Sequence, residues 1–347
     1  MIEILDPTQS ADVKRLTALR AEGIPVVDTY AEQCAELAQI RDPQSLGGTP
    51  TLLAESPGER FVYYPWRRAL VRIVGARAYA ELRTNRNREL LTPDEQERFA
   101  KARIGFAGLN VGNPGAVCIA LEGGARAMKL ADFDPLSLTN LNRFRSGIPD
   151  LGVNKATLTA RQILEIDPYY DLELYDKGLA PSNVEQFMTS PQLSLLVEET
   201  DALPLKISVR ESAKRARIPV IMVTGNGEGV ILDVERYDLE PELPILNGLL
   251  SERVARAAVS PATKALPPRE KAHLARDFMG SRYLDQRLLN SFNAFGTTLV
   301  GIPQLAESSF MRGAALCYAA KAIILGRLLS SGRYSFSFSE QLKTANA

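Results

Sequence analysis

The sequence predicts an α/β fold built on a doubly wound, mostly parallel sheet. Short apolar strand patterns alternate with helical stripes from residue 103 to residue 223, and this alternation is typical of parallel sheets. The strand pattern 104–107 leads directly into a glycine turn, 108–112, and then into a helical pattern over 113–127. That order places backbone N–H groups where a phosphate can bind. The sheet is therefore expected to be Rossmann-like, although a glycine turn that only packs helix against strand is the alternative.

Polar side chains follow the second strand pattern, 128–131. Asp132 comes about 24 residues after Gly108, where an acidic residue can accept hydrogen bonds from ribose hydroxyls. Arg143 and Lys155 follow among Asn and Asp residues, in a loop expected beyond the carboxyl end of a strand. Ligands of open α/β sheets bind at that edge. One arginine and one lysine in this setting suit a triphosphate with a metal better than a nicotinamide ring.

Three motifs in this stretch resemble one known family. They are G-L-N-V-G-N-P at 108–114, A-D-F-D-x-x-x-L-x-N-L-N-R at 131–143 and D-x-G-x-x-K at 150–155. Their order and spacing resemble the E1-like adenylyltransferases, the ThiF/MoeB/HesA family related to the ubiquitin-activating enzymes. The resemblance covers roughly residues 80–235. The glycine turn departs from the usual G-x-G-G-x-G-S-P, because it is one residue shorter and Asn110 stands near a usual glycine.

The resemblance implies an adenylyltransferase that uses ATP and Mg²⁺ to activate a carboxylate as an acyl-adenylate, with release of pyrophosphate. Asp132 would hold the ribose with Asp134 or Asn140 in support, and Lys155 and Arg143 would offset phosphate charge. The residues assigned to nucleotide binding are Gly108, Asn110, Gly112, Asp132, Asp134 and Asn140, and those assigned to catalysis are Arg143, Lys155, Asp201 and Arg88.

Asp201 is the predicted magnesium ligand. It follows the apolar strand pattern 193–197 in the run E-E-T-D, and a carboxylate just past a buried strand can face the phosphate turn. It also matches the T-D motif of the family, whose Asp binds the metal. The alternative role for Asp201 is the N-cap of a helix that begins near Pro204, and the two roles are compatible.

Arg88 belongs to an arginine-rich segment that resembles the R-Y-x-R-Q segment of the family. The match is loose, because Asn85 replaces the first arginine and Arg86 stands at the usual tyrosine. In the family the second arginine reaches across a dimer interface to the nucleotide. A homodimer whose active sites are completed in trans is therefore expected, and a solvated charge run is the alternative. The following Thr92–Glu95 segment predicts a capping box at a helix start.

Three segments are expected along the chain: an N-terminal α/β cap module at 1–80, an ATP-binding core at 81–235, and a C-terminal extension at 236–347. The extension is expected to be helical and antiparallel, to lie on the substrate side and to end in a buried helix. Its loop 301–306 is a candidate for lining a substrate cleft.

The composition is that of an ordinary globular protein. Among 347 residues the formal net charge is +0, so nothing indicates a nucleic-acid or membrane-surface partner. No signal peptide or membrane-spanning run is recognised, and a cytoplasmic location is expected. Cys34, Cys118 and Cys317 are far apart in the sequence, which indicates a reduced protein without a disulfide framework or four-cysteine zinc site. Cys317 is expected to be buried and inert, and His273 to lie on a helix surface.

Two other functions stay open at this stage. An NAD(P)-dependent oxidoreductase fits less well, because the glycine fingerprint is broken and no proton-transfer partner for hydride chemistry stands out. A non-catalytic nucleotide-binding protein is the other alternative. The activated carboxylate could be a protein C-terminus, a peptide or a small molecule. Without a zinc site or a transfer cysteine, a ubiquitin-like carrier is less favoured than in typical relatives.

Overall fold

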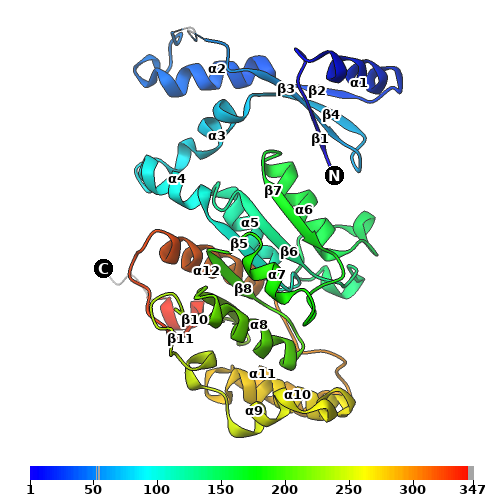
Figure 1. The fold of residues 1–347 in the computed structure, drawn as a ribbon, viewed down its shortest axis with the longest axis vertical. Coiled ribbons are helices and arrows are strands. Elements are labelled where there is room, and N and C mark those ends of the chain that lie inside the picture. Colours follow the sequence, from blue (N-terminus) through cyan, green and yellow to red (C-terminus); the bar gives the residue numbers. More distant parts are fainter. Residues whose placement is uncertain (52, 54, 343–347) are drawn as a thin grey trace. The chain divides into compact units, whose positions relative to one another are not determined.

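A computed structural model describes residues 1–51, 53 and 55–342, and two compact units divide the chain. One unit holds residues 1–97 with 163–170, and the other holds 98–162 with 171–347 (Figure 1). Residues 52 and 54 of the N-terminal module and 343–347 of the C-terminal extension lie outside the described residues. The division into three segments stays a prediction.

The first unit contains a four-stranded sheet in the order β1-β3-β4-β2. Strand β3 pairs antiparallel with β1 and β4, and β2 runs parallel to β4. Its core includes Leu19, Phe61 and Leu70. The end of α6 belongs to this unit, where the Tyr64 hydroxyl donates to the carbonyl of Leu164 at 3.0 Å. Its elements are β1 (Glu3–Leu5), α1 (Ser10–Ala21), β2 (Val26–Asp28), α2 (Tyr30–Arg41), β3 (Glu59–Tyr64), β4 (Ala69–Val74) and α3 (Ala76–Thr84).

The second unit contains a seven-stranded sheet in the order β11-β10-β9-β8-β5-β6-β7. Strands β7, β6, β5, β8 and β9 are parallel, whereas β10 and β11 are added antiparallel. The doubly wound, mostly parallel sheet predicted from the sequence is thereby confirmed. The strands are β5 (Arg103–Ala107), β6 (Ala127–Ala131), β7 (Asp171–Tyr175), β8 (Leu195–Glu198), β9 (Val220–Gly225), β10 (Val230–Glu235) and β11 (Gly332–Phe336).

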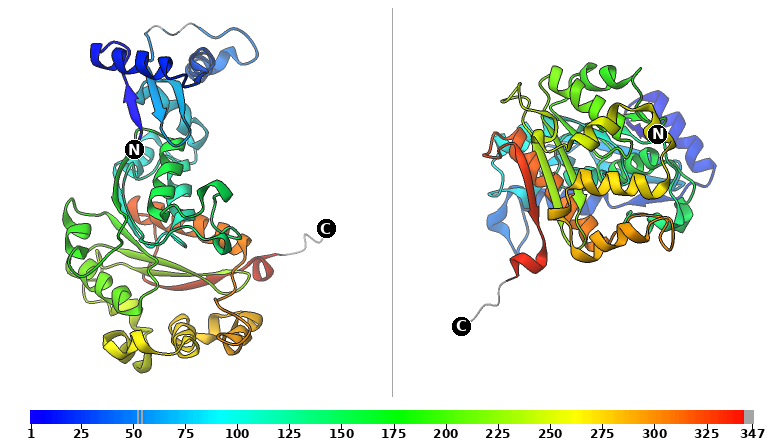
Figure 2. Two further views of the ribbon diagram at one scale, coloured as in Figure 1. Left: turned by 90° about the vertical axis from the view of Figure 1, so that its right-hand side faces the viewer. Right: turned by 90° about the horizontal axis from the view of Figure 1, so that it is seen from below.

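Helices cover this sheet in layers (Figure 2). Leu196 of β8 packs in a core cluster with Val209 and Ala213 of α8. Helix α12 packs against β9, β10 and α5. The helices are α4 (Pro93–Lys101), α5 (Asn113–Leu121), α6 (Lys155–Ile166), α7 (Val184–Thr189), α8 (Leu203–Arg215), α9 (Glu252–Val259), α10 (Pro268–Met279), α11 (Gln286–Ala294), α12 (Ala306–Ile324) and α13 (Phe338–Gln341). No helix in the described ranges is long and apolar enough to cross a membrane.

Glycines allow α5 and α12 to approach closely. A Cβ on Gly115 would lie 2.6 Å from the Leu316 side chain, and one on Gly313 would lie 2.8 Å from Pro114. Real Cβ atoms do not approach other atoms so closely, so these two contacts require glycine. Helix α5, which follows the glycine turn, is thus packed closely against α12.

Two local predictions have opposite outcomes. The helix after the glycine turn ends at Leu121, so the predicted helix over 113–127 was too long. Gly123, with φ of 69°, follows its end, and β6 already begins at Ala127. The capping box is confirmed: the amide of Glu95 donates to Thr92 Oγ1 at 3.2 Å, and the amide of Thr92 donates to the Glu95 carboxylate at 3.0 Å.

Candidate active site

The glycine turn lies between the ends of β5, β6 and β8. Gly108 has φ of 93° and donates its N–H to the carbonyl of Ala131 at 2.8 Å. A Cβ at Gly108 would lie 2.3 Å from the carbonyl oxygen of Glu199, and one at Gly112 would lie 2.4 Å from that of Gly108. Both positions therefore require glycine for close backbone contact. The side-chain Oδ1 of Asn110 is buried in this turn without a hydrogen-bond partner among the described residues.

Asp132 joins the glycine turn to the end of β6. Its two carboxylate oxygens accept from the amides of Leu109 at 2.7 Å and Asp134 at 2.8 Å. Burial raises the pKa of Asp132, and these amide hydrogen bonds oppose the rise. Each carboxylate oxygen can accept a further hydrogen bond, so the predicted contact with a ribose hydroxyl is compatible with this structural role.

Lys155 is brought to the same edge by the start of α6. Its Nζ lies 3.1 Å from Asp134 Oδ2, and the residue is only 4% exposed. Asn154 orients the helix start: its Oδ1 accepts from the amides of Ala156 and Thr157, and its Nδ2 donates to the Asp132 carbonyl at 2.9 Å. Asn154 was not predicted as a site residue, although an Asn directly before a helix is a capping signal.

One hydrogen-bond donor of Arg143, its Nε, has no acceptor among the described residues. Its Nη1 donates to Asn142 Oδ1 at 2.8 Å and to the carbonyl of Thr139 at 3.1 Å, while its Nε is buried without a partner in the described chain. Burial lowers the pKa of Arg143, and the charge of Asp201 opposes this shift. The N-L-N-R motif and the segment after β8 are thus close enough to interact electrostatically. The fourth predicted residue of this region, Asn140, accepts a hydrogen bond from the amide of Ser137 in its own turn at 3.1 Å.

Asp201 is exposed and borders a cavity of about 900 Å³. Helix α8 begins at Leu203, and its N-cap is Ala202 without a side-chain cap, so the alternative role of Asp201 as an N-cap was wrong. We call this cavity the chamber. Its lining comes from the glycine turn (Val111), 179–181, 199–206, Ser208, 223–225, Thr263, α10 (Lys271, Leu274, Ala275, Phe278, Met279), 302–304 and α12 (Arg312). The loop predicted to line a cleft contributes 302–304.

Two buried charged residues of the chamber were not predicted as site residues. Glu199 accepts a hydrogen bond from the Val223 amide at 2.6 Å, and burial raises its pKa to about 8. Arg312 is 3% exposed, and burial lowers its pKa to about 10. The sequence signal for Glu199 was the acidic run at the end of a strand. From that run only Asp201 was predicted as a site residue. Arg312 stands between small and apolar residues of α12, and this setting does not by itself distinguish a site residue from a structural one.

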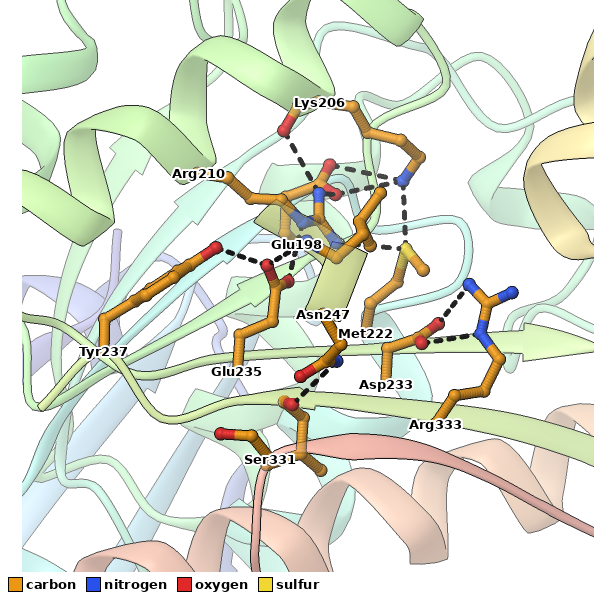
Figure 3. Close-up of polar contacts among 12 residues, drawn as sticks. Glu198, Lys206, Arg210, Met222, Asp233, Glu235, Tyr237, Asn247, Ser331 and Arg333 are labelled. Carbon is orange, nitrogen blue, oxygen red and sulfur yellow. Dashed lines mark hydrogen bonds and ion pairs between the residues drawn. The ribbon is translucent and has the colours of Figure 1, made fainter. Parts of the chain in front are cut away.

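A paired ionic network lies beside the chamber on β8, β10 and α8 (Figure 3). Glu198 contacts Lys206 at 3.0 Å and also Arg210, and Arg210 reaches Glu235 at 2.8 Å. The hydroxyl of Tyr237 donates to Glu235. Burial opposes ionisation of Glu198, but Lys206 and Arg210 outweigh this effect and lower its pKa. This network fixes the wall from which Glu199 and Lys206 face the chamber.

Arg88, His273 and the cysteines were also named from the sequence. Arg88 is exposed in the first unit, and its role in catalysis stays a prediction. His273 lies in α10, half-buried. Two of the cysteines that are far apart in the sequence come together in the fold: Cys118 of α5 and Cys317 of α12 have ligand atoms within 4.8 Å of each other and of Glu122. The close packing of α5 on α12 brings them together although about 200 residues separate them.

A family model described as the ThiF family matches residues 83–263, which is more than half of the chain. The chain belongs to the ThiF family. Among relatives, this ThiF-family chain is 37% identical over 342 residues to the Mycobacterium tuberculosis protein named "Uncharacterized protein MT1398", covering 98% of the chain and 46% of that protein. It is 31% identical over 131 residues to the Escherichia coli tRNA threonylcarbamoyladenosine dehydratase. The alignment covers 37% of this chain and 48% of that protein. The chain thus spans half or less of the length of these relatives.

A third relative is the M. tuberculosis "Probable adenylyltransferase/sulfurtransferase MoeZ", 31% identical over 143 residues, covering 39% of this chain and 35% of that protein. Among solved structures, the E. coli dehydratase TcdA aligns with a TM-score of 0.50 and 21% identity over 71% of this chain and 95% of TcdA. TcdA in complex with AMP aligns with a TM-score of 0.51 at 20% identity over the same shares. These likenesses show that the ThiF-family fold is shared.

Proposed function

We propose that this ThiF-family chain is an adenylyltransferase that uses ATP and Mg²⁺ to convert a carboxylate to an acyl-adenylate with release of pyrophosphate. The observation that carries the proposal is the convergence of the glycine turn, Asp132, Lys155, Arg143 and Asp201 at one edge of the sheet. Two comparisons support it: MoeZ is named a probable adenylyltransferase, and TcdA has been crystallised with ATP.

The residues at this edge fit a nucleoside triphosphate. Gly108 and Gly112 allow the tight main-chain packing of the turn before α5, and a turn at a helix N-terminus can present backbone N–H groups to a phosphate. Arg143 Nε and Asn110 Oδ1 are buried without partners in the described chain, and a bound nucleotide could complete their hydrogen bonds. Lys155 and Arg143 would offset the phosphate charge, and Asp132 would accept from the ribose.

The chemistry requires positioning more than covalent participation by the protein. A carboxylate oxygen of the substrate attacks the α-phosphorus, the P–O bond to the β-phosphate breaks, and pyrophosphate leaves. Lys155 and Arg143 would stabilise the charge that develops on the phosphate oxygens. Asp201 would hold Mg²⁺, which shields the phosphate charge when bound. Residues 81–235 would supply this machinery, and a cytoplasmic location is part of the proposal.

The experiment that tests this proposal is pyrophosphate release from ATP in the presence of Mg²⁺ and a panel of carboxylates, with NAD(H) binding measured in parallel. Adenylation predicts carboxylate-dependent release and saturable ATP binding. Tight NAD(H) binding that ATP does not compete with would instead support the oxidoreductase alternative. ATP binding without release by any carboxylate would leave the chain a nucleotide-binding protein.

We also propose that the active protein is a homodimer in which Arg88 completes the partner's site. Arg88 is exposed, as an arginine offered to a second subunit must be before assembly. Inactive Arg88→Ala and inactive Asp201→Ala subunits can be mixed under conditions of subunit exchange. Action in trans predicts that activity partly returns, because one site of each mixed dimer has both groups. A mixture that stays inactive after proven exchange rejects action in trans.

A further inference from the structure

Arg312 places an unbalanced positive charge at the wall of the chamber. Its guanidinium donates to the Ser308 carbonyl at 3.3 Å and to the side-chain oxygen of Gln304 at 3.3 and 3.2 Å, and all these acceptors are neutral. No carboxylate of the described residues lies within ion-pair distance of it, although it is only 3% exposed. A buried cation without an anionic partner is costly. The position therefore favours an anion from outside the chain.

The acidic group that acts on Arg312 does not cancel this charge. Glu199 interacts with Arg312 electrostatically, but burial raises its pKa to about 8. Near neutral pH most of its carboxyl groups therefore carry a proton. Arg312, whose pKa burial lowers only to about 10, stays charged under the same conditions. The lining has two other basic side chains. Lys206 is already paired with Glu198 at 3.0 Å, and Lys271 is exposed rather than buried.

Much of the chamber wall is apolar. Leu203 and Leu205 come from the start of α8, Leu274 and Phe278 from α10, and Ile302 from the loop before α12. The volume of about 900 Å³ is that of a small-molecule site. Apolar walls with one buried cation suit a ligand that has a single negative charge and an apolar body. A triphosphate, with several strongly hydrated charges, suits them poorly.

We propose that the chamber binds a small carboxylic acid with an apolar body, that Arg312 holds its carboxylate, and that this acid is the group presented for adenylation. The assignment rests on the proposed function. The chamber also touches Val111 of the glycine turn and Asp201, so an acid held there borders the edge assigned to the nucleotide. Arg312 would be a specificity-determining residue for a small free acid rather than for the C-terminus of a folded protein.

Binding of matched probes tests the assignment. Decanoate and phenylbutanoate are compared with decanol and decylamine by calorimetry on the full chain. We expect at least one of the two acids to bind, and the neutral and cationic probes to bind at least about tenfold more weakly. Arg312→Gln should weaken binding of that acid about tenfold or more, and Arg312→Lys should retain part of it. Arg256→Gln, at a side chain that is 73% exposed on α9, is the matched control.

Three outcomes would each overturn the assignment. The acid could bind the wild type and Arg312→Gln with equal affinity, decanol could bind as tightly as the acids, or neither acid could bind. Pyrophosphate release distinguishes this failure from failure of the proposed function. Acid binding that depends on Arg312, without pyrophosphate release from bound ATP, would reject adenylation and keep the acid site. Release supported by a peptide and unchanged in Arg312→Gln would keep adenylation and reject the acid site.

Discussion

Two groups of buried arginines in the second unit differ in their partners. Arg210 is fully buried between Glu198 and Glu235, and both carboxylates contact its guanidinium. Arg312 is almost as buried but donates only to neutral oxygens. Arg143 and Arg145 are half-buried, and each has one buried nitrogen without a hydrogen-bond partner among the described residues, whereas all three nitrogens of Arg312 donate to neutral oxygens. The difference separates an arginine paired with carboxylates inside the fold from arginines that have no anionic partner among the described residues.

The largest expected effect is on stability. Arg210→Met should lower the free energy of unfolding by about 3–5 kcal/mol, because it leaves Glu235 buried without its cation. Arg312→Met removes a buried cation that has no anionic partner, and should change stability by less than about 1 kcal/mol or increase it. Urea unfolding measured by circular dichroism compares the two, with exposed Arg256→Met as control. A similar loss in both variants would remove the distinction between the two groups.

The next effect is on catalysis. Lys155→Ala and Asp201→Ala should each reduce adenylate formation by about two orders of magnitude, since electrostatic groups of this kind contribute roughly 3 kcal/mol to the transition state. Lys155 is buried beside Asp134, so retention of the fold must be checked by circular dichroism. Lys177→Ala, at an exposed lysine, is the control. Near-normal turnover in a folded variant would show that its side chain does not have the proposed role.

A smaller effect concerns pH. Burial raises the pKa of Glu199 from 4.5 to about 8, so the folded state binds a proton that the unfolded state releases between these values. The free energy of unfolding should therefore fall as pH rises from about 5 to about 8. The nearby charges that act on Glu199 are Lys206, Glu198 and Arg312. Glu199→Gln should flatten this slope, measured by unfolding at several pH values, and an unchanged slope would assign it to other groups.

The smallest effect is expected at the cysteines. Cys34→Ala and Cys118→Ala should lose less than about 1 kcal/mol of stability, and buried Cys317→Ala about 1 kcal/mol, because each change removes one sulfur atom from its contacts. Adenylate formation should remain near that of the wild type in all three. A loss of turnover in a folded cysteine variant would contradict the expectation that no transfer cysteine is present.

The residues near the glycine turn were predictable because they follow one strand closely in the sequence. Asp132 comes directly after β6, Arg143 lies in the loop that follows, and Lys155 begins α6; the carboxyl ends of parallel strands and the loops beyond them lie at one edge of the sheet. Arg312 and the contact between Cys118 and Cys317 were not predictable in this way. They depend on how α12 packs against α5 and β9, and such packing between distant segments has no local sequence signal.

The backbone contact between Gly108 and Glu199 joins the two halves of the site. The amide of Glu199 donates to the Ala107 carbonyl at 2.6 Å, and the Glu199 carbonyl lies where a side chain on Gly108 would be. The glycine turn and the chamber wall are therefore in direct main-chain contact. If ATP binds at the turn and an acid binds in the chamber, as proposed, thermodynamic linkage requires reciprocity: the factor by which the acid changes the affinity for ATP equals the factor by which ATP changes the affinity for the acid.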